Sequence, residues 1–204
     1  MIDLSISEGL WVISINRPEK ANSLTRVMLG QLDEIAARAA GEGARALVLT
    51  GKGKVFSAGA DLEEARAGLA TDAIWEQLSA RIAGLPCLTI AALNGTLAGG
   101  AFGMALACDL RIAVPEARFF YPVMKLGFLP QPSDPKRMAA LIGPARAKMV
   151  LMAGQKIGAE EALAWGLIDR IVAPEALAEA AAALAADASA ARDGLAGSIK
   201  KLFD

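Results

Sequence analysis

Leu93-Asn94-Gly95-Thr96-Leu97-Ala98-Gly99-Gly100-Ala101 is the stretch on which the fold of this chain depends. It continues a run over residues 87–93 that has the length and composition of a buried strand. The adjacent glycines then begin a small, apolar helical segment near Gly99. The first amides of a helix have no acceptor within the helix and carry partial positive charge. This stretch therefore predicts a backbone site for a developing negative charge.

A second stretch also combines a preceding strand with small residues. Phe56-Ser57-Ala58-Gly59-Ala60-Asp61-Leu62 follows a buried strand predicted over residues 44–50 and a glycine-containing loop. Its small side chains would let a ligand approach the main chain closely. One amide from each stretch, aimed at a common point, would bind an oxyanion.

The rest of the chain alternates strands and helices. A hairpin is predicted over residues 4–15, and Thr25 can cap a helix whose apolar face carries Met28, Leu32, Ile35 and Ala36. Further helices are predicted at 74–83, 136–141, 144–153 and 159–165, and strands at 110–114 and 167–172. This order predicts an α/β fold in one domain over residues 1–204. Its core would cover about 1–173, with alanine-rich C-terminal helices over about 174–204.

Composition narrows the class of protein. The 204 residues are 54% hydrophobic, and the net charge is −1, from 21 basic and 22 acidic residues. This balance gives no basic excess for a nucleic acid. No apolar run reaches the length of a membrane span, and the first residues do not form a secretory signal, so we expect a cytoplasmic protein. Cys87 and Cys108 lie in apolar runs and are expected to be reduced core thiols.

The chain contains no histidine. This excludes Ser-His-Asp and Cys-His catalysis and removes the commonest metal ligand, so we expect no metal site. Any acid–base chemistry must then come from Asp, Glu, Lys, Tyr, Cys or a bound water.

Several motifs together resemble the enoyl-CoA hydratase/isomerase (crotonase) superfamily over nearly the whole chain. They are Arg17-Pro18-Glu19-Lys20-Ala21-Asn22-Ser23-Leu24, the two glycine stretches, Cys108-Asp109-Leu110, Pro122, Leu126-Gly127, and residues 117–119, 143–147 and 162–167. The resemblance implies a crotonase-like spiral of ββα turns and an acyl-CoA thioester as substrate, with no separate cofactor. It also implies a homo-oligomer such as a trimer. The family's C-terminal helical extension, which helps to build that trimer, looks truncated after Leu202.

The resemblance also implies roles for individual residues. The amides of Ala60 and Gly100 would form the oxyanion hole. The substrate-binding residues would be Lys20 and Ala21 near the CoA nucleotide, Ser57, Ala58, Asp61 and Leu62 along the pantetheine path, and Tyr121 close to the pocket. Alternatives remain open: a solvated loop role for Lys20, a core role for Tyr121, and a role for Asp61 in holding its own loop.

Two positions depart from the family pattern. Hydratases of this family use two glutamates, and the matching positions here are Gly103 and Val123, neither of which can carry a proton. Ordinary hydration is therefore not expected. Asp134 is the acid on the loop that follows, and it is a candidate catalytic residue, although the preference of Asp for helix N-caps favours a capping role. Glu63 and Glu64 are further acids near the first stretch, for which a solvated first-turn position is favoured.

We therefore expect an enzyme that stabilises a thioester enolate. Candidate reactions are double-bond isomerisation, hydration by a bound water, hydrolysis and decarboxylation. The alternatives are a non-catalytic acyl-CoA-binding relative, which Gly103 and Val123 favour, and a structural subunit without a ligand.

Overall fold

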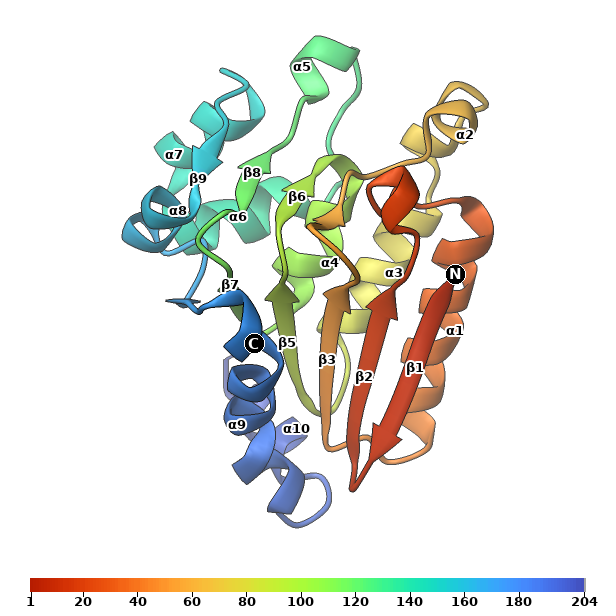
Figure 1. Cartoon of the computed structure of the whole chain (residues 1–204), viewed down its shortest axis with the longest axis vertical. Coiled ribbons are helices and arrows are strands. Elements are labelled where there is room, and N and C mark those ends of the chain that lie inside the picture. Colours follow the sequence, from red (N-terminus) through yellow and green to blue (C-terminus); the bar gives the residue numbers. More distant parts are fainter. Residues whose placement is uncertain (204) are drawn as a thin grey trace.

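The chain begins with a β-hairpin, as predicted. The computed structural model describes residues 1–203, so residue 204 of the predicted C-terminal helical segment lies outside it. Strands β1 (Ile2–Ser7) and β2 (Leu10–Ile15) pair antiparallel around Glu8 and Gly9, which both have positive φ. β2 then pairs parallel with β3 (Ala46–Gly51), so the hairpin forms one edge of a larger sheet (Figure 1).

Three turns of ββα follow the hairpin and give the spiral that the resemblance implied. The first turn contains β3, β4 (Val55–Ser57), α2 (Leu62–Arg66) and α3 (Ile74–Ala83). The second contains β5 (Leu88–Leu93), β6 (Thr96–Ala98) and α4 (Phe102–Ala107). The third contains β7 (Leu110–Ala113), β8 (Arg118–Phe120), α5 (Val123–Leu126) and α6 (Asp134–Ile142).

Each turn contributes one strand to each of two sheets. The six-stranded sheet has the order β1-β2-β3-β5-β7-β10, and all of its pairs except β1·β2 are parallel. The four-stranded sheet has the order β4-β6-β8-β9. The chain leaves the large sheet, passes through the small sheet and then enters a helix. The loop that follows the small-sheet strand of one turn is thereby placed beside the corresponding loop of the next.

Helices cover both faces of the large sheet. Leu47 and Leu49 of β3 meet α1 (Arg26–Gly41) and α3, whereas Val48 and Thr50 face α9 (Leu177–Ala190). This alternation follows from the two-residue period of a strand. Because both faces are covered, the strands are apolar throughout, which explains why they read as continuous hydrophobic runs.

The C-terminal third completes the structure with short elements. These are α7 (Pro144–Leu151), β9 (Ile157–Gly158), α8 (Ala159–Trp165), β10 (Arg170–Ile171) and α10 (Leu195–Lys200), together with a 3-10 helix at Pro174–Ala176. Three further 3-10 helices occur earlier in the chain, at Pro18–Lys20, Leu69–Thr71 and Gly99–Ala101. The strand predicted at 167–172 is reduced to β10. Leu167 and Ile168 are buried but lie in the turn between α8 and β10.

Other expectations about the core are confirmed. Thr25 caps α1 by accepting a hydrogen bond from the Met28 amide. Cys87 and Cys108 are free and buried, and burial raises their thiol pKa values to about 11 and about 12. Within residues 1–203, no helix combines the length and the apolar character needed to cross a bilayer.

Candidate active site

The two glycine stretches meet at Gly59. This residue has a φ of +90°, a conformation that favours glycine. A Cβ atom added there would lie 3.0 Å from the carbonyl oxygen of Ala98, 3.3 Å from Gly99 Cα and 3.4 Å from the Gly100 nitrogen. The backbone of the first stretch is therefore in direct contact with the backbone of the second.

The local hydrogen bonds leave particular amides outside the ladders. Leu24 forms a parallel bridge with Ala60, in which Leu24 donates to the Gly59 carbonyl and Asp61 donates to the Leu24 carbonyl. The N–H of Ala60 takes part in neither bond. The Gly100 amide lies in the first turn of the 3-10 helix Gly99–Ala101, where no carbonyl of that helix can accept it. The bridge at Leu24 and the 3-10 helix at Gly99–Ala101 thus do not use either of the two predicted amides.

Trp75 closes the site behind Gly100. A Cβ atom added at Gly100 would lie 3.2 Å from the indole ring of Trp75. The ring is buried, and its Nε1 donates a hydrogen bond to the Leu69 carbonyl at 2.8 Å. Position 100 therefore has to be a small residue, because α3 packs directly against the second stretch.

A groove of about 590 Å³ extends from Ala60 across the first stretch. Most of the predicted substrate-binding residues line it: Lys20, Ala21, Ala58, Asp61 and Leu62. Ser57 does not, because it is fully buried beneath the groove. Its hydroxyl donates to the Asn22 carbonyl at 2.8 Å and accepts from the Gly59 amide at 3.1 Å. The expectation that Ser57 lines the ligand path is therefore corrected to a role in holding the loop.

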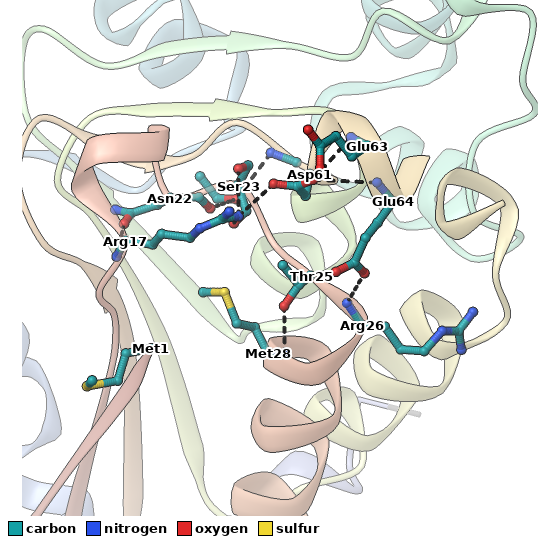
Figure 2. A network of polar contacts seen from close by, with 12 residues as sticks. Met1, Arg17, Asn22, Ser23, Thr25, Arg26, Met28, Asp61, Glu63 and Glu64 are labelled. Carbon is teal, nitrogen blue, oxygen red and sulfur yellow. Dashed lines mark hydrogen bonds and ion pairs between the residues drawn. The ribbon is translucent and has the colours of Figure 1, made fainter. Parts of the chain in front are cut away.

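Figure 2 shows a polar network that includes several of the residues lining this groove. Asp61 caps α2 by accepting from the Glu63 amide at 3.1 Å, and it forms an ion pair with Arg17 at 2.8 Å. The Arg17 guanidinium holds the pKa of Asp61 below its usual value. Glu64 accepts from the Arg26 amide at 2.6 Å, whereas Glu63 is exposed. The structural role predicted for Asp61 is confirmed.

Asp134 has a different environment from the one predicted. The N-cap of α6 is Ser133, and Asp134 is the first helical residue, so the capping role proposed for Asp134 is wrong. Its side chain is 0% exposed and accepts a hydrogen bond from the Tyr121 hydroxyl at 3.0 Å. The other carboxyl oxygen, Oδ1, has no hydrogen-bond partner among residues 1–203. Burial, with a smaller contribution from the charge of Glu76, raises the pKa of Asp134 to about 7.

The carboxyl of Asp134 occupies the space left by the missing side chain of Gly103. A Cβ atom added at Gly103 would lie 3.1 Å from Asp134 Oδ1. Gly103 comes three residues after Gly100 and therefore lies about 5 Å along the same helical surface. Val123, the other departure from the family pattern, is buried at the start of α5. The structure thus places one acid one helical turn away from the predicted oxyanion hole.

Tyr121 lies in this buried cluster and does not line the groove. Its ring is 3% exposed and stacks on Phe102 of α4 with a centroid separation of 5.4 Å. Burial and the neighbouring Asp134 raise the pKa of the Tyr121 hydroxyl well above its usual value, so the phenol stays protonated. Tyr121 therefore contacts the candidate acid directly, and its single O–H donates to Asp134.

Four polar residues of the site, Glu76, Ser79, Ser133 and Arg137, are not predicted by the sequence pattern. Glu76 accepts hydrogen bonds from both the amide and the hydroxyl of Ser133, and Arg137 donates to the Ser79 hydroxyl at 2.8 Å. Glu76 and Ser79 belong to α3, whereas Ser133 and Arg137 belong to the α6 region. The i, i+4 spacing of Trp75 and Ser79 was the available signal, because it places both on one face of α3.

Comparisons with known proteins agree with this architecture. Residues 5–203 match the family model described as enoyl-CoA hydratase/isomerase. A probable enoyl-CoA hydratase of Mycobacterium tuberculosis is 38% identical over 173 residues, which is 84% of this chain and 70% of that protein. The 1,2-epoxyphenylacetyl-CoA isomerase of Escherichia coli is 33% identical over 190 residues, covering 88% of this chain and 72% of the relative. The crystal structure of an enoyl-CoA hydratase from Bacillus anthracis superposes with a TM-score of 0.92 at 32% identity, covering 99% of this chain and 81% of that chain.

Proposed function

The chain belongs to the enoyl-CoA hydratase/isomerase family, and we propose that it converts an acyl-CoA thioester by stabilising its enolate with the amides of Ala60 and Gly100. The observation that carries this proposal is the contact of Gly59 with Gly99 and Gly100, which brings the two amide-bearing stretches together. Donors fixed in place before the reaction stabilise a developing oxyanion most effectively, and removal of one donor costs on the order of 3 kcal/mol.

We propose that the CoA moiety binds in the groove beside Ala60. Lys20 is exposed at its edge and can meet a phosphate as a point charge. The small side chains of Ala21 and Ala58 leave the main chain accessible to the pantetheine arm. The thioester carbonyl would then reach the end of the groove at Ala60.

Asp134 is the proposed proton carrier in place of the two family glutamates. In its charged form it would take a proton from the acyl chain, while the bonding electrons move toward the thioester oxygen held by the two amides. The resulting carboxylic acid would return the same proton to another carbon of the acyl chain. A single acid that moves one proton in two steps suits isomerisation of a double bond better than hydration, because hydration in this family uses two glutamates.

The second candidate is binding of an acyl-CoA without turnover. Gly103 and Val123 favour it, because both family glutamates are absent. The groove and the two amides would serve such a protein equally well, so only a measurement of turnover separates the two candidates.

The test is a panel of CoA esters that includes a 2-enoyl, a 3-enoyl and a malonyl thioester, assayed by chromatography with calorimetry alongside. We expect interconversion of the 2-enoyl and 3-enoyl esters, and loss of that activity in Asp134→Asn with binding retained. Binding without any product would favour the non-catalytic candidate. Absence of both binding and product would contradict the proposed use of the groove.

A further inference from the structure

Helix α3 contacts both the stretch that contains Gly100 and the region around Asp134. Trp75 packs against Gly100, and the next residue, Glu76, reaches the start of α6. One turn further along α3, the Ser79 side chain lies 3.5 Å from the Cβ position of Gly103 and accepts a hydrogen bond from Arg137. A movement of α3 relative to α6 would therefore change the position of Asp134 relative to the Gly100 amide.

Glu76 makes a second polar connection, between α3 and the residue that precedes α6. One carboxyl oxygen accepts from the Ser133 amide at 3.2 Å, and the other accepts from the Ser133 hydroxyl. Hydrogen bonds to a charged acceptor are stronger than bonds between neutral groups. The pair is half-buried, so water competes with it less than at an exposed site. Ser133 directly precedes Asp134, so this clamp limits where the Asp134 carboxyl can point.

Three ionisable residues surround that carboxyl. Tyr121 precedes α5 and donates to Oδ2, Arg137 lies one turn along α6, and Glu76 approaches from α3. Helix α4 presents Gly103, which has no side chain. The negative charge of Glu76 opposes ionisation of Asp134, whereas Arg137 and the Tyr121 hydroxyl favour it. Glu76 therefore influences both the position of Asp134 and its proton affinity.

We propose that Glu76 is a positioning residue, which clamps Ser133 and thereby holds the Asp134 carboxyl against Gly103. This inference rests on the proposed function of Asp134 as the proton carrier. Two effects of the Glu76 side chain can be separated: its hydrogen bonds to Ser133 fix the geometry, and its charge makes a smaller contribution than burial to the proton affinity of Asp134.

The experiment compares Glu76→Gln, Ser133→Ala and the matched control Glu179→Gln, which changes an exposed glutamate on α9. Steady-state rates are measured from pH 5 to 9 with the CoA ester that the wild type converts. Glu76→Gln should lower kcat by up to about a hundredfold, because a small misplacement of a reacting group has effects of this size. The pH midpoint of its remaining activity should move to lower pH. Ser133→Ala keeps the charge of Glu76, so it should lower kcat with little movement of the midpoint, and the control should match the wild type.

A second readout does not depend on turnover. Asp134 can be titrated by carbon-detected NMR of the side-chain carboxyl, assigned with Asp134→Asn, in the wild type and in Glu76→Gln. A lower midpoint in Glu76→Gln supports the inference even if no ester is converted. If Asp134→Asn abolishes turnover while Glu76→Gln leaves kcat, the rate profile and the Asp134 titration unchanged, Glu76 has no positioning role and the proposed function still stands.

Discussion

Replacement of Asp134 by asparagine tests the buried acid without any substrate. The side chain is 0% exposed, and its pKa is raised from the ordinary value of 3.8 to about 7. An acid whose folded-state pKa is raised binds its proton more tightly in the folded protein than in the unfolded chain. Stability is therefore unaffected by this group below about pH 4, falls as pH rises from about 4 to 7, and stays reduced above that range.

The size of the effect follows from the pKa difference. A rise of about three units, at about 1.36 kcal/mol for each, corresponds to a penalty of about 4 kcal/mol above pH 7. Asp134→Asn removes the charge and keeps the shape of the side chain. The free energy of unfolding of the variant, relative to that of the wild type, should therefore increase by about 4 kcal/mol between pH 4 and pH 8.

The assay is urea unfolding of both proteins at several pH values, followed by circular dichroism. Titrating groups that do not interact with Asp134 are common to the two proteins, so their contributions cancel in the difference. Any effect of asparagine that is independent of pH shifts the whole curve and leaves its slope unchanged. A difference that stays constant from pH 4 to pH 8 would refute the reasoning, because Asp134 would then titrate equally in the folded and unfolded states.

Four further predictions concern the site. Gly100→Pro removes the amide donor and should lower turnover by at least about a hundredfold. Circular dichroism is the control for folding, and wild-type rates would show that the oxyanion hole does not include the Gly100 amide. Gly103→Ala places a methyl group 3.1 Å from Asp134 Oδ1 and should cost about 1–3 kcal/mol in urea unfolding, whereas an unchanged midpoint would contradict the close contact. In the wild type, kcat/KM should rise with pH up to about 7, because the charged form of Asp134 takes the proton. Tyr121→Phe removes a hydrogen bond that favours the charged form of Asp134 and should move the rise in kcat/KM to higher pH. If the pH profile of kcat/KM does not change, Tyr121 does not influence the group that titrates.

The fold was predictable because local signals and tertiary packing agree. Helix α3 has the predicted bounds, since its apolar residues recur at helical spacing and Gly84 follows its last turn. Strands β3 and β5 lie at the large sheet's centre, so their continuous apolar runs reflect burial on both faces. β10 was predicted too long, because apolar character reports burial and does not distinguish a buried turn from a strand.

The candidate site was only partly predictable. The two glycine stretches can be identified from local sequence, since each combines small residues with a preceding strand. The environment of Asp134 depends on contacts with residues far away in the sequence, such as the clamp between Glu76 and Ser133, 57 residues apart. No periodic pattern encodes that contact. The Asp preference for N-caps was therefore misleading, because the preceding serine takes the cap position.

The contact between position 103 and Asp134 also limits how the site can be altered. A glutamate introduced at 103 would have to start from a Cβ position 3.1 Å from the Asp134 carboxyl and would add a second negative charge to the same enclosed space. A glutamate at position 103 and an aspartate at position 134 are thus alternatives. A variant that carries both acids should be less stable than a protein that carries either acid alone. Conversion of this site into one with glutamates would need exchanges at 103 and 134 together, with effects that do not add.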